Sequence, residues 1–193
     1  AIGDRAIELA LDSLKNCSNP GLERHRIEHA SVLDPEMIHE LSSLGIVAVV
    51  QPHFVYSDFW VPQRLGERAR WTYPFKSMLT AGVKMAGSSD CPVEPINPLL
   101  GIWAAVSRPD SRREEALSTE EAIFMYSVGG AYSCFEEEWR GVIKPGATAD
   151  LIVISGDPLE TPPAQLRELK VEMTIVGGRI SYVSNHLKAR IEA

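Results

Sequence analysis

The sequence predicts an α/β fold, in which short apolar strands alternate with helices, followed by a smaller layer of antiparallel strands. Residues 45–52 form a continuous β-branched apolar run, which is typical of a parallel strand covered on both faces. Shorter strand patterns at 24–30 and 83–89 lie on either side of it along the chain, and helical patterns separate the three. This alternation indicates consecutive βα units that share one parallel sheet.

The pattern changes after Trp139, where helical spacing gives way to turns and short strands. Residues 150–154 read as one strand, and residues 171–180 read as a strand pair around a Gly-Gly turn. We therefore predict two portions, an α/β portion over residues 1–137 and a β-rich portion over residues 138–193.

Helix signals fill the spaces between the predicted strands. Asp34 before Pro35 is a typical helix start, and Ser118 followed by Glu121 is the pattern of a capping box. Helices are expected at residues 4–16, 34–43, 74–81, 97–106 and 118–135.

The segment from His53 to Tyr73 is rich in aromatic side chains and follows no single helical period. Long connections of this kind often carry function. We predict a lid or a pocket wall here. Gln51 and His53, at its start, either contact substrate or make loop hydrogen bonds.

Composition argues against several classes of partner. The chain has 193 residues, of which 45% are hydrophobic, and this suits a globular protein with a sizeable core. Its net charge of −7 and its lack of a Lys/Arg cluster argue against nucleic acid as a partner. The apolar runs are too short to span a bilayer, so we expect no membrane partner.

The cysteines indicate a reducing environment. Cys17, Cys91 and Cys134 are widely spaced and form no CxxC pair, so we predict reduced thiols and a cytoplasmic location. The chain begins at Ala1 without methionine, and its first residues read as the entry to a helix. We expect it to be a piece of a longer protein.

Two polar side chains follow predicted parallel strands at the points where those strands end. His29 closes the strand at 24–30, and Asp90 follows the small residues Gly-Ser-Ser that end the strand pattern at 83–89. They lie about 60 residues apart, or about two βα units of roughly 30 residues each. Parallel strands share one carboxyl edge, where α/β proteins place their active sites. The residues alone also allow a simpler interpretation, a hydrogen-bonded strand-end histidine and a turn aspartate.

Short motifs run in one order along nearly the whole chain. They include Arg-Ile-Glu-His-Ala and Gly-Ser-Ser-Asp-Cys-Pro-Val-Glu-Pro, and they lie at residues 1–6, 26–30, 50–52, 87–95 with 97–99, and 145–151. Together they resemble the amidohydrolase superfamily, and specifically the branch called amidohydrolase family 3, which includes N-substituted formamide deformylase-like enzymes.

The resemblance implies a fold. Members of that superfamily form a metal-dependent (β/α)8 barrel with a β-sandwich assembled from both ends of the chain. Residues 1–137 would then supply strands six to eight of the barrel, and residues 138–193 would supply part of the sandwich. The chain would be the C-terminal portion of such an enzyme.

The resemblance also implies roles for two residues. His29 matches the histidine that ends strand six and binds a metal, and Asp90 matches the strand-eight aspartate. That aspartate binds the metal and takes the proton of the attacking water. The family's other ligands, on strands one, four and five, would lie ahead of Ala1. A catalytic zinc site needs three or more donors and an open position. We therefore expect one or two ions in the complete enzyme and only part of their site in this chain.

These roles imply a metal-dependent hydrolase, with zinc as the expected metal, that breaks non-peptide C–N bonds of a small amide-like substrate with metal-activated water. One alternative is a noncatalytic fragment or self-associating module, because a partial barrel leaves strand edges unpaired. Another is a deaminase of a ring amidine, which would use the same ligands.

Overall fold

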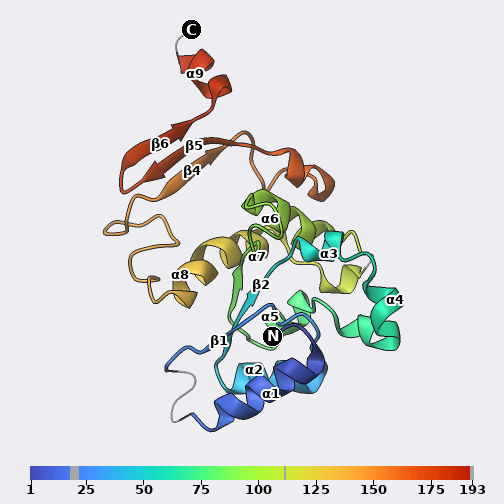
Figure 1. The fold of residues 1–193 in the computed structure, drawn as a ribbon. Coiled ribbons are helices and arrows are strands. Elements are labelled where there is room, and N and C mark those ends of the chain that lie inside the picture. Colours follow the sequence, from blue (N-terminus) through green and yellow to red (C-terminus); the bar gives the residue numbers. More distant parts are fainter. Residues whose placement is uncertain (18–21, 111, 192–193) are drawn as a thin grey trace.

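Two three-stranded sheets form the framework of the computed structural model, which describes residues 1–17, 22–110 and 112–191. The first sheet is parallel and has the order β1 (Arg26–Glu28), β2 (Val47–Val50), β3 (Met85–Gly87). The second is antiparallel and has the order β4 (Leu151–Ile154), β5 (Val171–Val176), β6 (Arg179–Val183). Figure 1 shows the second sheet above the first, with helices between them. The α/β fold predicted from the sequence is confirmed.

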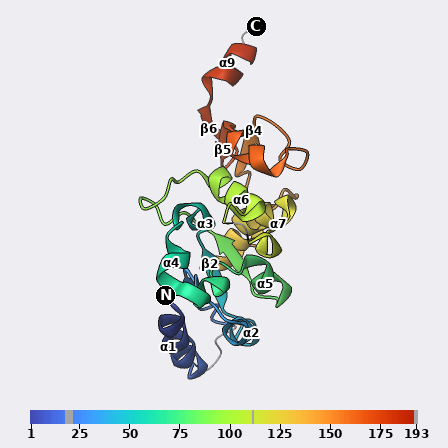
Figure 2. The same ribbon diagram turned by 90° about the vertical axis from the view of Figure 1, so that its right-hand side faces the viewer.

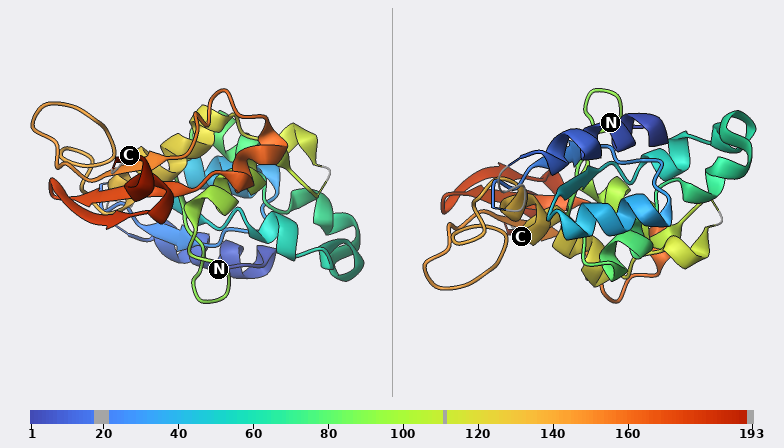
Figure 3. Two further views of the ribbon diagram at one scale, coloured as in Figure 1. Left: turned by 90° about the horizontal axis from the view of Figure 1, so that it is seen from above. Right: turned by 90° about the horizontal axis from the view of Figure 1, so that it is seen from below.

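Helices connect and cover the strands. The α-helices are α1 (Asp4–Lys15), α2 (Pro35–Ser43), α3 (Phe54–Ser57), α4 (Val61–Leu65), α5 (Phe75–Thr80), α6 (Pro98–Ser107), α7 (Thr119–Phe124), α8 (Gly130–Ser133) and α9 (Asn185–Ile191). Three segments are 3-10 helices, η1 (Gly66–Trp71), η2 (Arg113–Glu115) and η4 (Pro163–Glu168), and η3 (Met125–Gly129) is a π-helical turn. Figure 2 shows α1 and α2 at the opposite end of the molecule from the antiparallel sheet. In Figure 3 the antiparallel sheet is therefore in front in the view from above, and α1 and α2 are in front in the view from below.

The central strand β2 is buried on both faces. Val47 and Val49 pack with the ring of Tyr132, while Ala48 and Val50 lie in the main hydrophobic core. All four residues of β2 are buried, as expected for a parallel strand covered by helices on both sides. The observed strand is shorter than the predicted run of residues 45–52 but lies entirely within it.

Helix caps account for where the helices begin. The side chain of Asp34 accepts a hydrogen bond from the backbone N–H of Met37 (2.8 Å), which caps α2. Ser118 and Glu121 form a reciprocal capping box at the start of α7. The helix starts predicted at these positions are confirmed.

The predicted helix over residues 118–135 is interrupted. It is observed as α7, the π turn η3 and α8, and it ends where Phe135 takes a φ of 62°. A Cβ atom built on Gly129, the last residue of η3, would overlap the carbonyl oxygen of Met85 in β3. The wider turn therefore occurs where the helix backbone presses directly on the parallel sheet, and only glycine fits there.

The aromatic segment after β2 is made of the short helices α3, α4 and η1 rather than one helix, as the sequence predicted. The antiparallel sheet contains the predicted Gly-Gly hairpin. Gly177 and Gly178 have φ values of 56° and 77°, which a tight turn between β5 and β6 requires. Within the part of the chain that the structure describes, no helix is both long and apolar enough to cross a membrane.

Candidate functional site at the carboxyl edge of the parallel sheet

His29 follows β1 directly. Its backbone N–H donates to the carbonyl of Val49 (2.9 Å), and its φ of 75° then turns the chain out of the sheet. Its imidazole stacks on Phe54, with ring centroids 6.4 Å apart. Its Nδ1 atom is buried and has no hydrogen-bond partner among the described residues. A left-handed non-glycine backbone and an unpaired buried nitrogen both cost free energy, and such features gather where a protein binds a ligand.

Asp90 lies on the turn that follows β3. The N–H of Ser88 donates to the carbonyl of Val50 (2.8 Å), which extends the ladder one residue beyond the strand. Asp90 is exposed, has a φ of 56°, and its carbonyl accepts from the N–H of Val93 (2.8 Å). Because β1 and β3 both run parallel to β2, the structure brings His29 and Asp90 to the same edge of the sheet, on either side of β2.

Gln51 follows β2 and is buried between the other two strand ends. Its Nε2 donates to the carbonyl of Val49 (3.1 Å) and to Oγ of Ser88 (2.8 Å). These two bonds fix the orientation of the amide, because the reverse orientation would place two oxygens together. The Oε1 atom is then buried without a partner among the described residues. This edge of the sheet therefore holds two unpartnered polar atoms, one on Gln51 and one on His29.

His53 immediately precedes α3 and lies two residues after Gln51. Its Nδ1 is hydrogen-bonded to Oε2 of Glu94 (2.5 Å), and only 14% and 10% of the two side chains are exposed. The loop hydrogen bond that the sequence offered as one interpretation of His53 is therefore present, and its Nε2 remains for other contacts. Glu94 was missed as a functional candidate, although it lies in the same motif as Asp90. Its signal was an acidic residue between apolar neighbours in Pro-Val-Glu-Pro.

The lid segment contacts this site through aromatic rings. Tyr56 packs against the imidazole of His53 (5.7 Å between centroids) and edge-on against Trp103 of α6 (5.3 Å). Tyr56 also lines a cavity of about 680 Å³ together with Asp58 and Tyr73. Burial raises the pKa of Asp58, and burial and a hydrogen bond to Asp58 raise the pKa of Tyr73. Tyr56 therefore links the surroundings of His53 to the lining of this cavity.

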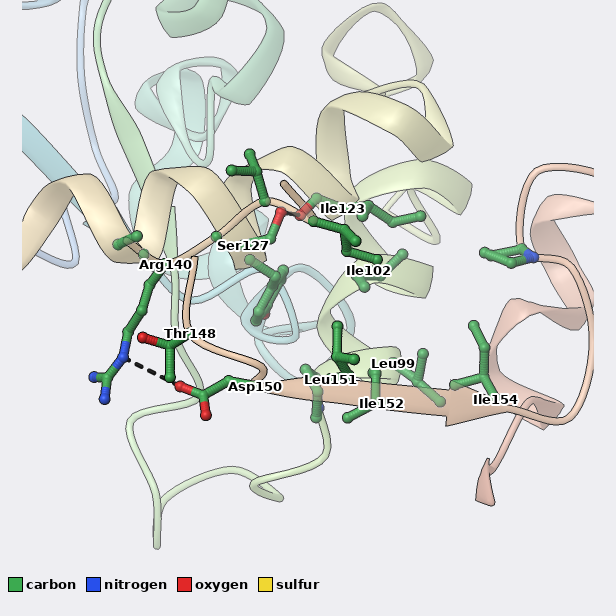
Figure 4. A pocket seen from close by; sticks show the side chains of 18 of the residues that line it. Leu99, Ile102, Ile123, Ser127, Arg140, Thr148, Asp150, Leu151, Ile152 and Ile154 are labelled. Atoms are coloured by element: carbon green, nitrogen blue, oxygen red, sulfur yellow. Dashed lines mark hydrogen bonds and ion pairs between the residues drawn. The ribbon is translucent and has the colours of Figure 1, made fainter. Parts of the chain in front are cut away.

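Figure 4 shows a second cavity, which lies between α6, η3 and β4. It measures about 630 Å³ and is mostly apolar, with an ion pair between Arg140 and Asp150 (3.1 Å) at one end. Its lining does not include His29, Gln51, His53 or Asp90. It is therefore separate from the edge that carries the candidate site.

The residues at the sheet edge fit a divalent metal in part. An imidazole nitrogen and a carboxylate oxygen are donors that zinc and similar cations accept. Within the described residues, no three His, Cys, Asp or Glu side chains gather closely enough to hold a metal ion. His29 and Asp90 offer two such donors at this edge, and a metal site built on them would need at least one more.

Comparison with known proteins gives a consistent set of relatives. The chain is 40% identical to YtcJ of Bacillus subtilis (strain 168) over 192 residues, covering 94% of this chain and 36% of that protein. It is 29% identical to the N-substituted formamide deformylase of Arthrobacter pascens over 194 residues, covering 94% of this chain and 35% of that protein. It also resembles the crystal structure of an uncharacterized metal-dependent hydrolase from Pyrococcus furiosus, with a TM-score of 0.75, 37% identity, and coverage of 83% of this chain and 33% of that one.

The chain spans about a third of the length of the curated relatives it matches. The family match itself extends over residues 1–182, from the segment before α1 into β6. The match therefore includes both sheets and all four candidate site residues. On this basis the chain belongs to the amidohydrolase family.

Proposed function

We propose that the protein containing this chain is a metal-dependent hydrolase that cleaves non-peptide C–N bonds in small amide-like substrates. The supporting observation is that the unpartnered Nδ1 of His29 and the exposed carboxylate of Asp90 flank β2 at one edge of a parallel sheet. In this proposal residues 1–137 are strands six to eight of a (β/α)8 barrel, and residues 138–193 belong to a β-sandwich. Two relatives are consistent with it, one named a deformylase and one a metal-dependent hydrolase.

His29 and Asp90 would hold the metal, for which we propose zinc, with further ligands from elsewhere in the protein. Such an ion lowers the pKa of a bound water to about 7 and polarises a carbonyl group. Asp90 would accept the proton of the attacking water and return it to the leaving nitrogen. Its exposed position on the turn after β3 suits a group that must reach water and substrate in succession.

Gln51 and His53 would orient the substrate. The free Oε1 of Gln51 is a hydrogen-bond acceptor at the centre of the edge, which suits the N–H of an amide. Glu94 occupies Nδ1 of His53, so any contact of this imidazole with substrate is made through Nε2. Both side chains are held by the protein before substrate arrives, which lowers the entropic cost of binding.

Metal content tests this proposal. In the intact protein, His29→Ala and Asp90→Asn should each weaken Zn²⁺ binding by at least roughly tenfold, because each removes a ligand. His39→Ala is the control, since His39 is exposed on α2. Zn²⁺ affinity is measured by competition with a chromophoric chelator, and hydrolysis is assayed on a panel of N-alkyl formamides with and without chelator. Wild-type affinity in His29→Ala would contradict the proposed site.

A second candidate concerns residues 1–193 taken alone. The absence of a third nearby ligand among the described residues favours a chain that does not hydrolyse amides by itself. Turnover of an amide by this polypeptide, lost on chelation, would refute that candidate.

The thiols of Cys17, Cys91 and Cys134 are free, and we propose a reducing, cytoplasmic location on that basis.

A further inference from the structure

The side chain of Tyr126 passes between two glycines to reach the turn that carries Asp90. Tyr126 lies in the π turn η3, which contacts β3. A Cβ atom on Gly87, at the end of β3, would lie 2.6 Å from its ring, and one on Gly101 of α6 would overlap its hydroxyl oxygen. Both distances are shorter than real Cβ contacts allow, so two separate elements lack a side chain where this ring lies.

The hydroxyl of Tyr126 donates a hydrogen bond to the carbonyl of Ser88 (3.2 Å). Ser88 is also held by its N–H, which donates to Val50 (2.8 Å), and by its Oγ, which accepts from Gln51 (2.8 Å). Three residues, one from η3 and two from the end of β2, thus bind Ser88. Ser88 stands two positions before Asp90, whose exposed carboxylate depends on the backbone of this turn for its direction.

The ring of Tyr126 is partly buried against the hydrophobic core. Burial raises the pKa of Tyr126, so the phenol remains a donor throughout the physiological pH range. The ring also lines the apolar cavity between α6, η3 and β4. A π turn inserted in an α-helix shifts the residues that follow it, and such turns are frequent at functional sites.

We propose that Tyr126 is a positioning residue for Asp90, because its hydroxyl fixes the carbonyl of Ser88 two residues before Asp90. The inference rests on the proposed function, because it gives the Ser88–Asp90 turn a purpose in metal binding. Tyr126 itself touches neither substrate nor metal in this scheme. Its role is to hold the turn in the one direction that presents the carboxylate to the site.

Hydrogen exchange on the intact protein tests the contact directly. Tyr126→Phe removes the hydroxyl and keeps the ring between its glycines, so the fold should persist. Exchange of the Ser88 and Val93 amides should become faster by roughly three- to tenfold, the range expected for losing one hydrogen bond. Tyr132→Phe is the matched control, because a phenylalanine keeps the packing on Val47 and Val49 and the contact with the guanidinium of Arg24 (4.1 Å). Equal exchange in Tyr126→Phe and wild type would overturn the inference.

Cobalt binding then separates positioning from mere stabilisation. In the wild-type protein, added Co²⁺ should give visible ligand-field bands, and Tyr126→Phe should weaken Co²⁺ binding severalfold and change those bands, while Tyr132→Phe should not. If wild type binds no Co²⁺, the proposed function fails. If wild type binds Co²⁺ and Tyr126→Phe binds it with equal affinity and an identical spectrum, the positioning role fails. Gly101→Ala, which pushes on the same hydroxyl, should reproduce the Tyr126→Phe spectrum where that variant folds.

Discussion

Asp90 and Glu94 lie four residues apart in one loop, yet their carboxylates differ in solvent exposure. Asp90 is exposed, whereas Glu94 is buried and bonded to His53. A buried carboxylate next to an imidazole is tolerated only while the partner remains, because either group alone would be desolvated without compensation. The pair therefore fastens the Asp90 turn to the start of α3.

Truncation of Glu94 should destabilise the protein more than replacement of its carboxylate by an amide. Glu94→Ala leaves Nδ1 of His53 unpaired and should lower the free energy of unfolding by roughly 1–3 kcal/mol. Glu94→Gln keeps an acceptor for Nδ1 and should cost less. Denaturant titration measures both, with exposed Glu138→Ala as a control expected to change stability by less than about 0.5 kcal/mol. A Glu94→Ala variant as stable as wild type would show that the pair carries no such role.

Sequence reasoning located the residues at strand ends but not their partners. The placement of His29 and Asp90 at one edge follows from parallel strands separated by βα units, which is a local pattern. The Glu94 contact joins residues 41 positions apart, and the Tyr126 contact joins residues 38 positions apart. Neither spacing follows from a helix or strand period, so only the folded chain reveals these partners.

At the scale of elements, the contact between η3 and β3 distinguishes two neighbouring glycines. Gly129 has no room for a Cβ atom because the Met85 carbonyl oxygen occupies that space, whereas a Cβ on Gly130 would meet nothing within 4 Å. Both residues have helical backbone angles. The two positions therefore separate the steric effect of a methyl group from its effect on helix propensity.

Gly129→Ala and Gly130→Ala should change stability in opposite directions. Gly129→Ala must displace the helix or β3 and should destabilise by roughly 1–3 kcal/mol. Gly130→Ala should stabilise by roughly 0.4–1 kcal/mol, because alanine reduces the entropy of the unfolded chain without strain. Thermal unfolding followed by circular dichroism measures both. Equal effects at the two positions would contradict the close approach of η3 to β3.

Helix starts were predictable because capping residues act locally, as at Asp34 and Ser118. Strand lengths were harder to predict from the sequence. The strand predicted at residues 24–30 is observed only as Arg26–Glu28, because His29 and Ala30 adopt φ values of 75° and 46°. Nothing in the sequence marks those two residues as left-handed. The π turn was also missed, since residues 118–135 fit an ordinary helical period.

At the scale of the whole molecule, the antiparallel sheet carries exposed apolar side chains. Ile152 of β4 and Tyr182 of β6 pair with Thr174 of β5 in one row across the sheet, and both are at least half exposed. Large apolar side chains that lie open to water on a sheet tend to be buried against another surface. We therefore propose that residues 1–193, when isolated, associate with a second copy through this sheet.

Sedimentation velocity tests the association. The isolated chain should show a dimer whose fraction rises with concentration, and the double variant Ile152→Glu/Tyr182→Glu should shift it to monomer by placing two like charges in the row. Leu9→Glu, at a similarly exposed apolar position on α1, is the control and should leave the dimer intact. A wild-type chain that stays monomeric at all concentrations would contradict the proposal.

The two ends of the described chain differ in their surroundings. The amino group of Ala1 donates to the carbonyl of Glu28 (2.7 Å), and the carbonyl of Ala1 accepts from the N–H of Ala30 (3.0 Å). Ala1 is therefore hydrogen-bonded to the residues on both sides of His29. By contrast, α9 projects away from the rest of the molecule (Figures 1 and 2). A change in the backbone at Ala1 would thus move the peptide groups on either side of His29, whereas a fluorophore carried on α9 would lie far from that region.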